Sequence, residues 1–285
     1  MKNIFTIDTE DWFHANYEES LFENDASWKS TVEENTEIYL QALAENHSTA
    51  TFFVLGFVAE QHPGLVRRIA EAGHEIASHG YGHQLVYRQT PEVFREDIRR
   101  SKKLLEDLTG REVLGYRAPS WSITRESFWA LPILEEEGFR FDSSIFPFKN
   151  FLYGVDGAPR FPFRARKYDP LAETLVEIPP STIHVPGLNV PFSGGFYFRV
   201  LPYFLIESFT CQVNRRGYPV VFYLHPREID PAQPRLRLNG RDRFIHYYGI
   251  QWCERKMKRL LKKFPCESIS SAWDGGHLPV KDAED

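Results

Sequence analysis

Short apolar segments typical of buried strands alternate with amphipathic helical segments, and this alternation constrains the fold more than any other feature. Strands are predicted at 3–7, 51–55, 74–78, 113–116, 139–141, 174–178 and 220–224. Helices are predicted between and after them, at 31–46, 63–72, 91–109, 124–138, 201–216 and 250–264. Strands separated by helices form parallel sheets. About seven such strands in 285 residues predict an α/β barrel.

Two segments interrupt the alternation, 147–170 and 179–198, and both are rich in proline, glycine and aromatic residues. Connections of this length are usually functional or disordered, and the aromatic content favours ordered loops. We expect these loops to lie over the carboxyl ends of the strands, where α/β barrels build their active sites. The prediction is one barrel domain over residues 1–285, with a C-terminal extension from about residue 235.

Charge and composition exclude several classes of partner. The formal net charge of -5 gives no electrostatic reason to expect nucleic acid or an anionic membrane. No stretch approaches the ~18 apolar residues of a membrane span, and the N-terminus enters a strand without the apolar core of a signal peptide. The three cysteines form no CxxC pair, which is typical of free thiols in a reducing compartment. We therefore expect a cytoplasmic protein, with no prediction of its oligomeric state.

An acidic cluster and a histidine pair follow two of the predicted strands. Asp8, Glu10 and Asp11 end the first strand, and His79 and His83 follow the third. Each group has a plainer explanation, as a solvated strand end or as surface histidines beside glycines. Together, a carboxylate and two imidazoles can form an open divalent-metal site with positions left for water. Either Glu10 or Asp11 would be the third ligand, and the spacing leaves both open.

Three further residues suggest roles in proton transfer. Asp8 is the last residue of its strand, and its rigid placement suits a general base. Arg117 precedes Ala118 and Pro119 in an extended segment, and it would pair with Asp8 and keep that carboxylate ionised. His225 follows the most apolar strand and would protonate a leaving group as general acid. The plainer alternatives are a surface arginine and a buried, hydrogen-bonded histidine.

These residues fall in five motifs that resemble the polysaccharide deacetylase family, over roughly residues 3–226. The motifs are Thr6–Asp11, Ser78–His83, Arg117–Pro119, Phe141–Ser144 and Tyr223–His225, and the run Ala50–Gly56 also resembles the family. The segments Phe192–Arg199 and His246–Cys253 are similar to deacetylases of bacterial exopolysaccharide gene clusters associated with exosortase systems. The resemblance implies a distorted (β/α) barrel, one divalent ion (Zn²⁺, or else Co²⁺ or Ni²⁺) and hydrolysis of acetyl groups on sugars.

The chain departs from the usual family pattern at three places. The family has two adjacent aspartates, base then ligand, where this chain spaces its acids as Asp8, Glu10 and Asp11. Tyr223 replaces an aliphatic residue, and Ser120-Trp121 stands where a tyrosine often follows the proline. The last two changes would shape the substrate groove more than the reaction.

The expected function is metal-dependent removal of acetyl groups from N-acetylated sugars of a bacterial polysaccharide or its precursor. In this reading Arg117 and Asp142 hold the base Asp8 and the acid His225 in place. Trp121 and Tyr197 would stack on a sugar face, although most aromatics in such a chain belong to the core. Two alternatives remain: a hydrolase of another C–N bond, such as a cyclic amide or ureide, and a catalytically silent sugar-binding protein.

Overall fold

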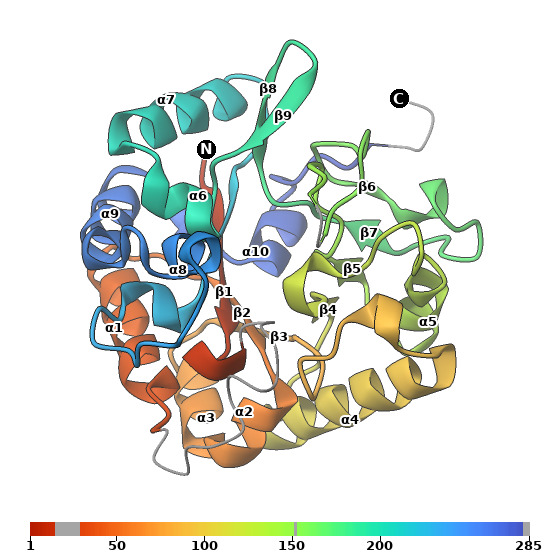
Figure 1. Ribbon diagram of the computed structural model, residues 1–285. Coiled ribbons are helices and arrows are strands. Elements are labelled where there is room, and N and C mark those ends of the chain that lie inside the picture. Colours follow the sequence, from red (N-terminus) through yellow and green to blue (C-terminus); the bar gives the residue numbers. More distant parts are fainter. Residues whose placement is uncertain (15–28, 151–152, 282–285) are drawn as a thin grey trace.

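A curved, mostly parallel sheet forms the centre of the molecule (Figure 1). The computed structural model describes residues 1–14, 29–150 and 153–281. The sheet order is β10-β1-β2-β3-β4-β5-β7-β6, and β11 pairs with β1. These strands are β1 (Asn3–Thr9), β2 (Thr51–Val54), β3 (Glu75–Ser78), β4 (Gly115–Tyr116), β5 (Phe141–Asp142), β6 (Phe163–Arg164), β7 (Val176–Glu177), β10 (Val221–Leu224) and β11 (Cys266–Glu267). Among the described strands of this sheet, the β6–β7 pair is antiparallel and all other pairs are parallel.

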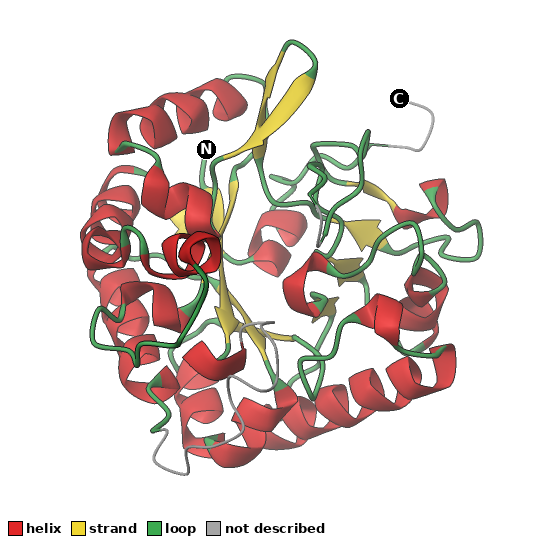
Figure 2. Ribbon diagram, in the orientation of Figure 1, coloured by secondary structure: helices red, strands yellow, loops and turns green. Residues whose placement is uncertain are grey.

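Most helices pack on the outer face of this sheet, and the last one lies against the inside of its curve (Figure 2). They are α1 (Val32–Glu45), α2 (Gly56–Gln61), α3 (Pro63–Glu71), α4 (Pro91–Thr109), α5 (Ala130–Glu136), α6 (Gly195–Val200), α7 (Tyr203–Asn214), α8 (Gly240–Tyr247), α9 (Ile250–Lys263) and α10 (Ile269–Asp274). Across the described parts of the chain, none of these helices combines the length and the apolar run needed to cross a bilayer.

Alternate side chains of β1 point to opposite faces of the sheet, and this determines which of them reach the inside of the barrel. Phe5 and Ile7 belong to the large core between sheet and helices, whereas Ile4 belongs to a smaller cluster inside the curve of the sheet. Phe53 of β2 and Ile269 of α10 share that inner cluster. Because side chains alternate along a strand, Ile4, Thr6 and Asp8 share the inner face. The strand therefore directs Asp8 into the barrel.

The predicted distorted barrel of about seven parallel strands is confirmed. Seven strands, β10, β1, β2, β3, β4, β5 and β7, run parallel in one path. The ring is incomplete between β7 and β10, where the loop residue Ser181 donates its backbone N–H to Val221 O at 3.3 Å. All seven carboxyl ends meet at one rim, which places the predicted functional residues together.

Two local predictions differ from the structure. Helix α5 begins at Ala130 rather than at Thr124, because Pro132 lacks an N–H and fits only the first helical turn. The segment 179–198, predicted as a loop, contains a hairpin of β8 (Thr182–Val185) and β9 (Leu188–Pro191). The turn between them is Pro186-Gly187, with Gly187 at φ +80°, a combination that favours a tight reversal.

Candidate active site

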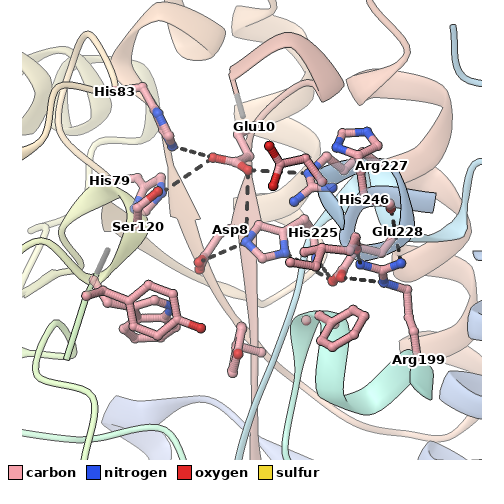
Figure 3. Close-up of a pocket in the computed structure, with 17 residues that line it drawn as sticks. Asp8, Glu10, His79, His83, Ser120, Arg199, His225, Arg227, Glu228 and His246 are labelled. Atoms are coloured by element: carbon pink, nitrogen blue, oxygen red, sulfur yellow. Dashed lines mark hydrogen bonds and ion pairs between the residues drawn. The ribbon is translucent and has the colours of Figure 1, made fainter. Parts of the chain in front are cut away.

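A cavity of about 270 Å³ lies at the rim where the strands end (Figure 3). Asp8, Glu10, His79, His83 and His225 all line it, so the structure brings together five residues predicted from separate motifs. Asp8 comes from the end of β1 and His79 directly follows β3. His225 directly follows β10. The parallel topology, rather than closeness in sequence, makes these side chains neighbours.

Three of these side chains form a group suited to a metal ion. Glu10 Oε2 lies 2.6 Å from His83 Nε2 and 3.7 Å from His79 Nε2. The ligand atoms of all three residues lie within 4.8 Å of one another, and all three residues are buried. Bonds of ~2.1 Å to one tetrahedral ion would place such atoms ~3.4 Å apart, so a modest adjustment fits a divalent cation.

The protonation states of the group also suit metal binding. His79 Nδ1 lies 2.8 Å from the carbonyl oxygen of Arg117, which can only accept, so Nδ1 donates and Nε2 presents its lone pair to the cavity. Burial raises the pKa of Glu10, but the facing histidines outweigh it, led by His83, and hold that pKa well below its usual value. The carboxylate is therefore ionised.

The histidine pair sits on a loop that contains two residues with left-handed backbone conformation. Gly80 has φ +74° and His83 has φ +54°. Asp97 of α4 fastens this loop, since its carboxylate accepts from Tyr81 N at 2.7 Å and from Gly82 N at 3.2 Å. The loop reverses direction tightly, which brings His83 back over His79.

Asp11 points away from the metal group. Its Oδ1 accepts from the backbone N–H of Trp12 at 3.0 Å and of Thr31 at 3.3 Å. It lines a different, smaller cavity beside His62. Of the two ligands that the sequence left open, the geometry favours Glu10. A spacing of two residues could have indicated this, because Asp8 and Glu10 fall on the same side of an extended chain.

Arg117 and Asp8 form a fully buried ion pair. Arg117 Nη1 donates to Asp8 Oδ1 at 2.5 Å and to Thr6 Oγ1 at 2.8 Å, and Nε donates to Ser143 O at 3.2 Å. The guanidinium is completely inaccessible to solvent. A buried arginine with this many acceptors fixes the orientation of the carboxylate and leaves Asp8 Oδ2 toward His225 Nε2 at 3.6 Å.

His225 is held by Glu228, which the sequence interpretation missed. Glu228 Oε2 lies 3.0 Å from His225 Nδ1, and Glu228 Oε1 accepts from Arg199 Nε at 3.0 Å. Burial lowers the pKa of His225, but attraction to Glu228 outweighs it and raises that pKa above 6.5. Burial raises the pKa of Glu228, yet His225 and Arg199 bring it to about 2. The negative charge of Glu228 thus favours the protonated imidazole, the form that a general acid requires.

Replacing Glu228 by glutamine is expected to lower kcat by about 10- to 100-fold, in the range seen for carboxylates that orient a functional histidine. Without the negative charge the pKa of His225 falls. A general acid works only below its pKa, so the alkaline limb of the rate profile moves to lower pH. The measurement is kcat against pH for both proteins.

Asp230→Asn is the matched control, because Asp230 accepts from Asn35 and Ala232 and does not line the cavity. This control keeps the wild-type profile. A Glu228→Gln protein that loses thermal stability but keeps an unshifted pH profile would show that Glu228 has only a structural role.

Asp142 occupies a different position from the one predicted. It is completely buried, does not line the cavity and is hydrogen-bonded to Ser144 and to Glu177 of β7. Burial raises the pKa of both Asp142 and Glu177, and their mutual repulsion adds to the rise for Glu177. The raised pKa values favour one proton shared between the two carboxyl groups across the β5–β7 pair. Glu228, not Asp142, contacts the acid.

Glu177→Gln is expected to raise the midpoint of thermal unfolding at neutral pH. The raised pKa values mean that the folded state retains a proton that the unfolded chain releases above about pH 4, so wild-type stability falls as pH rises. Glutamine donates a hydrogen bond there without having to take up a proton from solution. For the wild-type carboxyl, each unit by which the pKa is raised corresponds to about 1.4 kcal/mol of unfolding free energy that is lost as the pH rises.

Unfolding midpoints at pH 5 and pH 7.5 test this prediction, with the exposed Glu173→Gln as control. The stabilisation of Glu177→Gln should be larger at pH 7.5. Equal shifts at the two pH values would refute the shared proton.

Of the two aromatic residues that were predicted to stack on a sugar, Trp121 lines the cavity and Tyr197 does not. Trp121 lines the cavity, packed edge-on against Phe146 and Tyr223 with ring centroids 5.2 and 4.9 Å away. Its backbone is left-handed, at φ +55°, which is strained for a bulky residue and common at functional sites. Tyr197 does not line the cavity and contacts Phe196, which does.

Arg227 is a second cavity residue that the sequence interpretation missed. Its Nε lies 3.8 Å from Glu10 Oε1, on the side of Glu10 away from the histidines (Figure 3). Its buried Nε and Nη1 atoms have no hydrogen-bond partner among the described residues. Buried donors without partners cost about 1–3 kcal/mol each. These donors are therefore available to an oxygen of a bound ligand.

Comparison with known proteins agrees with this site. Residues 22–140 match the family model described as polysaccharide deacetylase, and residues 143–274 match one described as a domain of unknown function (DUF3473). The chain thus contains a polysaccharide deacetylase domain, as its motifs predict. Asp8, Glu10 and His225 lie outside the residues matched by the deacetylase model, although the fold gathers them with His79 and His83.

Relatives of known name cover only part of the chain. A peptidoglycan deacetylase-like protein of Gibberella zeae is 29% identical over 141 residues, which are 50% of this chain and 40% of that protein. A peptidoglycan deacetylase of Helicobacter pylori is 33% identical over 109 residues, 37% of this chain and 35% of that protein. The chain therefore spans less than half the length of these relatives.

A solved structure is similar over almost the whole chain. It comes from Mycobacterium smegmatis and is assigned to the polysaccharide deacetylases. The TM-score is 0.59 at 22% identity, and the match covers 98% of this chain and 93% of the other. At this identity the likeness concerns the fold.

Proposed function

We propose that this protein is a metal-dependent hydrolase that removes acetyl groups from N-acetylated sugars of a polysaccharide or its precursor. The observation that carries the proposal is the shared cavity. One space is faced by a carboxylate oriented by a buried arginine, by a histidine hydrogen-bonded to Glu228, and by a Glu-His-His group. The names of the partial relatives, peptidoglycan deacetylases, support the choice of N-acetylated sugars.

Glu10, His79 and His83 would hold the ion, with Zn²⁺ as the first candidate and Co²⁺ or Ni²⁺ as alternatives. Such an ion supplies Lewis-acid polarisation of the acetyl carbonyl and a lower pKa for water. Three protein ligands leave positions open for both. Asp8 and His225 lie beside this group, with His225 Nε2 3.9 Å from Glu10 Oε1.

Asp8 and His225 divide the two proton transfers of amide hydrolysis. Arg117 occupies Asp8 Oδ1, so Oδ2 accepts the proton of the water that attacks the acetyl carbon. His225 Nε2 donates a proton to the nitrogen as the C–N bond breaks, which releases acetate and a free amine. The distance of 3.6 Å between Asp8 Oδ2 and His225 Nε2 is too long for a hydrogen bond, so each group remains available to the substrate or the water.

Acetate release from chemically defined sugars tests the proposal. The zinc-loaded protein is incubated with N-acetylglucosamine oligomers and with peptidoglycan fragments, and both acetate and new free amines are measured. Equal amounts of the two products are expected. O-acetylated sugars without an acetamide serve as the comparison: acetate from these alone would indicate an esterase. No acetate from any of them, with the ion bound, would favour a sugar-binding protein.

A further inference from the structure

The cavity is small, and one of its walls continues onto the surface. Its volume of about 270 Å³ lies just below the ~300–1,000 Å³ of typical small-molecule sites, so it has room for about one sugar unit. Helix α8 forms part of the wall through Asp242, Ile245 and His246. Figure 1 shows α8 beside α6 and α9. One path from the cavity to the surface therefore runs past these helices.

A line of aromatic rings leads outward along this route. It consists of Phe196 on α6, Phe244 and Tyr248 at α8, and Trp252 on α9, and it is called the aromatic track below. Successive ring centroids are 5.8, 4.7 and 6.2 Å apart. Phe196 lines the cavity, and the other three rings are 49%, 42% and 49% exposed.

These exposures are unusual for side chains of this type. Large aromatic rings are normally buried, and a contiguous exposed group of them marks an interaction site. Phe244 and Tyr248 are four residues apart and Trp252 follows after one further turn, so a single face of two consecutive helices presents all three. The face begins at a cavity-lining ring, which makes it continuous with the candidate active site.

We propose that the aromatic track binds the glycan chain that extends from the sugar held in the cavity, so that the substrate is a polymer or long oligomer rather than a single sugar. Pyranose rings have apolar C–H faces that pack on aromatic rings, while their hydroxyls stay in water. Tilted rings in series suit a flexible chain of such units. The proposal rests on the proposed deacetylase function and specifies its substrate class.

A membrane surface is the competing occupant for exposed aromatic rings. Membrane-surface binding usually combines aromatic residues with net attraction to anionic lipid. The helices that carry the track are basic on balance: Arg241 and Arg243 flank Asp242 on α8, and α9 holds six lysine and arginine residues against Glu254. Charge therefore does not separate the two occupants, and the continuity of the track with the cavity, through Phe196, favours the glycan chain.

The test is the dependence of kcat/KM on chain length. N-acetylglucosamine oligomers of one to six units are compared for the wild type and for Phe244→Ala, Tyr248→Ala and Trp252→Ala. In the wild type kcat/KM should rise with length. Each ring removed should reduce the value for the longest oligomer by about three- to tenfold, mainly through KM, because an aromatic contact is worth about 0.5–1.5 kcal/mol. Phe204→Ala on α7, also at an exposed ring, is the matched control and keeps the wild-type dependence.

Binding separates this inference from the deacetylase proposal. The affinity of each oligomer for the same proteins is measured by calorimetry in the Asp8→Asn background, whether or not hydrolysis occurs. Affinity that rises with length, and falls in the track variants, supports the track even if no acetate is released. The proposal is overturned if affinity does not depend on oligomer length, or if the length dependence survives all three replacements. It is also overturned if the wild type binds phosphatidylglycerol vesicles and the variants lose this binding while their affinity for the oligomers is unchanged.

Discussion

Asp8→Asn is expected to lower acetate release by about 10²- to 10⁴-fold, the usual contribution of a positioned general base. Asparagine keeps an oxygen that can accept from Arg117, but it cannot take a proton from water. The Glu10-His79-His83 group remains, so the variant should still bind one divalent ion. The measurement is kcat/KM for an N-acetylated oligomer together with ion content.

The same replacement should also destabilise the fold. Arg117 is completely buried, and removing the charge of its partner leaves an uncompensated guanidinium, which costs about 3–5 kcal/mol when a buried pair is broken. Rates are therefore compared well below the unfolding midpoint, with circular dichroism confirming the folded state. A folded Asp8→Asn protein with wild-type turnover would remove Asp8 from the role of base.

Asp11→Asn provides the matched control. It changes an acid three residues along the same segment to its amide, but Asp11 accepts from backbone N–H groups and lines a different cavity. We expect it to retain most of the activity and all of the ion. Loss of the ion in Asp11→Asn, with retention in Glu10→Gln, would reverse the choice between the two acids.

The second large effect is expected from the histidine pair. The double replacement His79→Ala/His83→Ala removes two of three proposed ligands, so bound metal should fall from about one ion per chain to near zero, and activity with it. Elemental analysis after loading with zinc, cobalt or nickel measures this directly and identifies the preferred ion. The metal-loaded wild type should lose its activity to a chelator and recover it on metal addition.

Two histidines outside the cavity supply the control. His184 on the β8–β9 hairpin and His277 after α10 are replaced by alanine together, which preserves the number of imidazoles removed. This protein should keep the ion. If wild type and both double variants bind equal amounts of metal, the ion is held elsewhere. If none binds metal after loading, the Glu-His-His group is not a metal site.

The parallel barrel could be predicted because its signals are local. Buried strands such as 220–224 are continuous apolar runs, and helices such as α3 carry proline and glycine at their ends. The rim position of Asp8, His79 and His225 followed from topology alone, since carboxyl ends of parallel strands meet. The hairpin β8–β9 has only four residues per strand, and it was hidden by the proline and glycine around it.

The partners of the functional residues were harder to predict. Glu228 had a readable signal, because Pro226 follows His225 and Glu228 stands at the third helical position, the pattern of a capping box. Arg199 and Arg227 had none, since their contacts depend on how α6 and α8 pack beside the barrel. Asp142 was misplaced because a position after a strand fixes the rim but not the direction of a side chain.

The position of β1 between β2 and β10 has a consequence for the order in which this protein matures. β1 pairs with β2, and also with β10 and β11, which begin more than 210 residues later. During synthesis the segment bearing Asp8 and Glu10 emerges before the other strands of the sheet, yet its neighbour β10 emerges only more than 210 residues later. A nascent chain halted at residue 140, where the deacetylase match ends, would leave that edge unpaired and prone to aggregation.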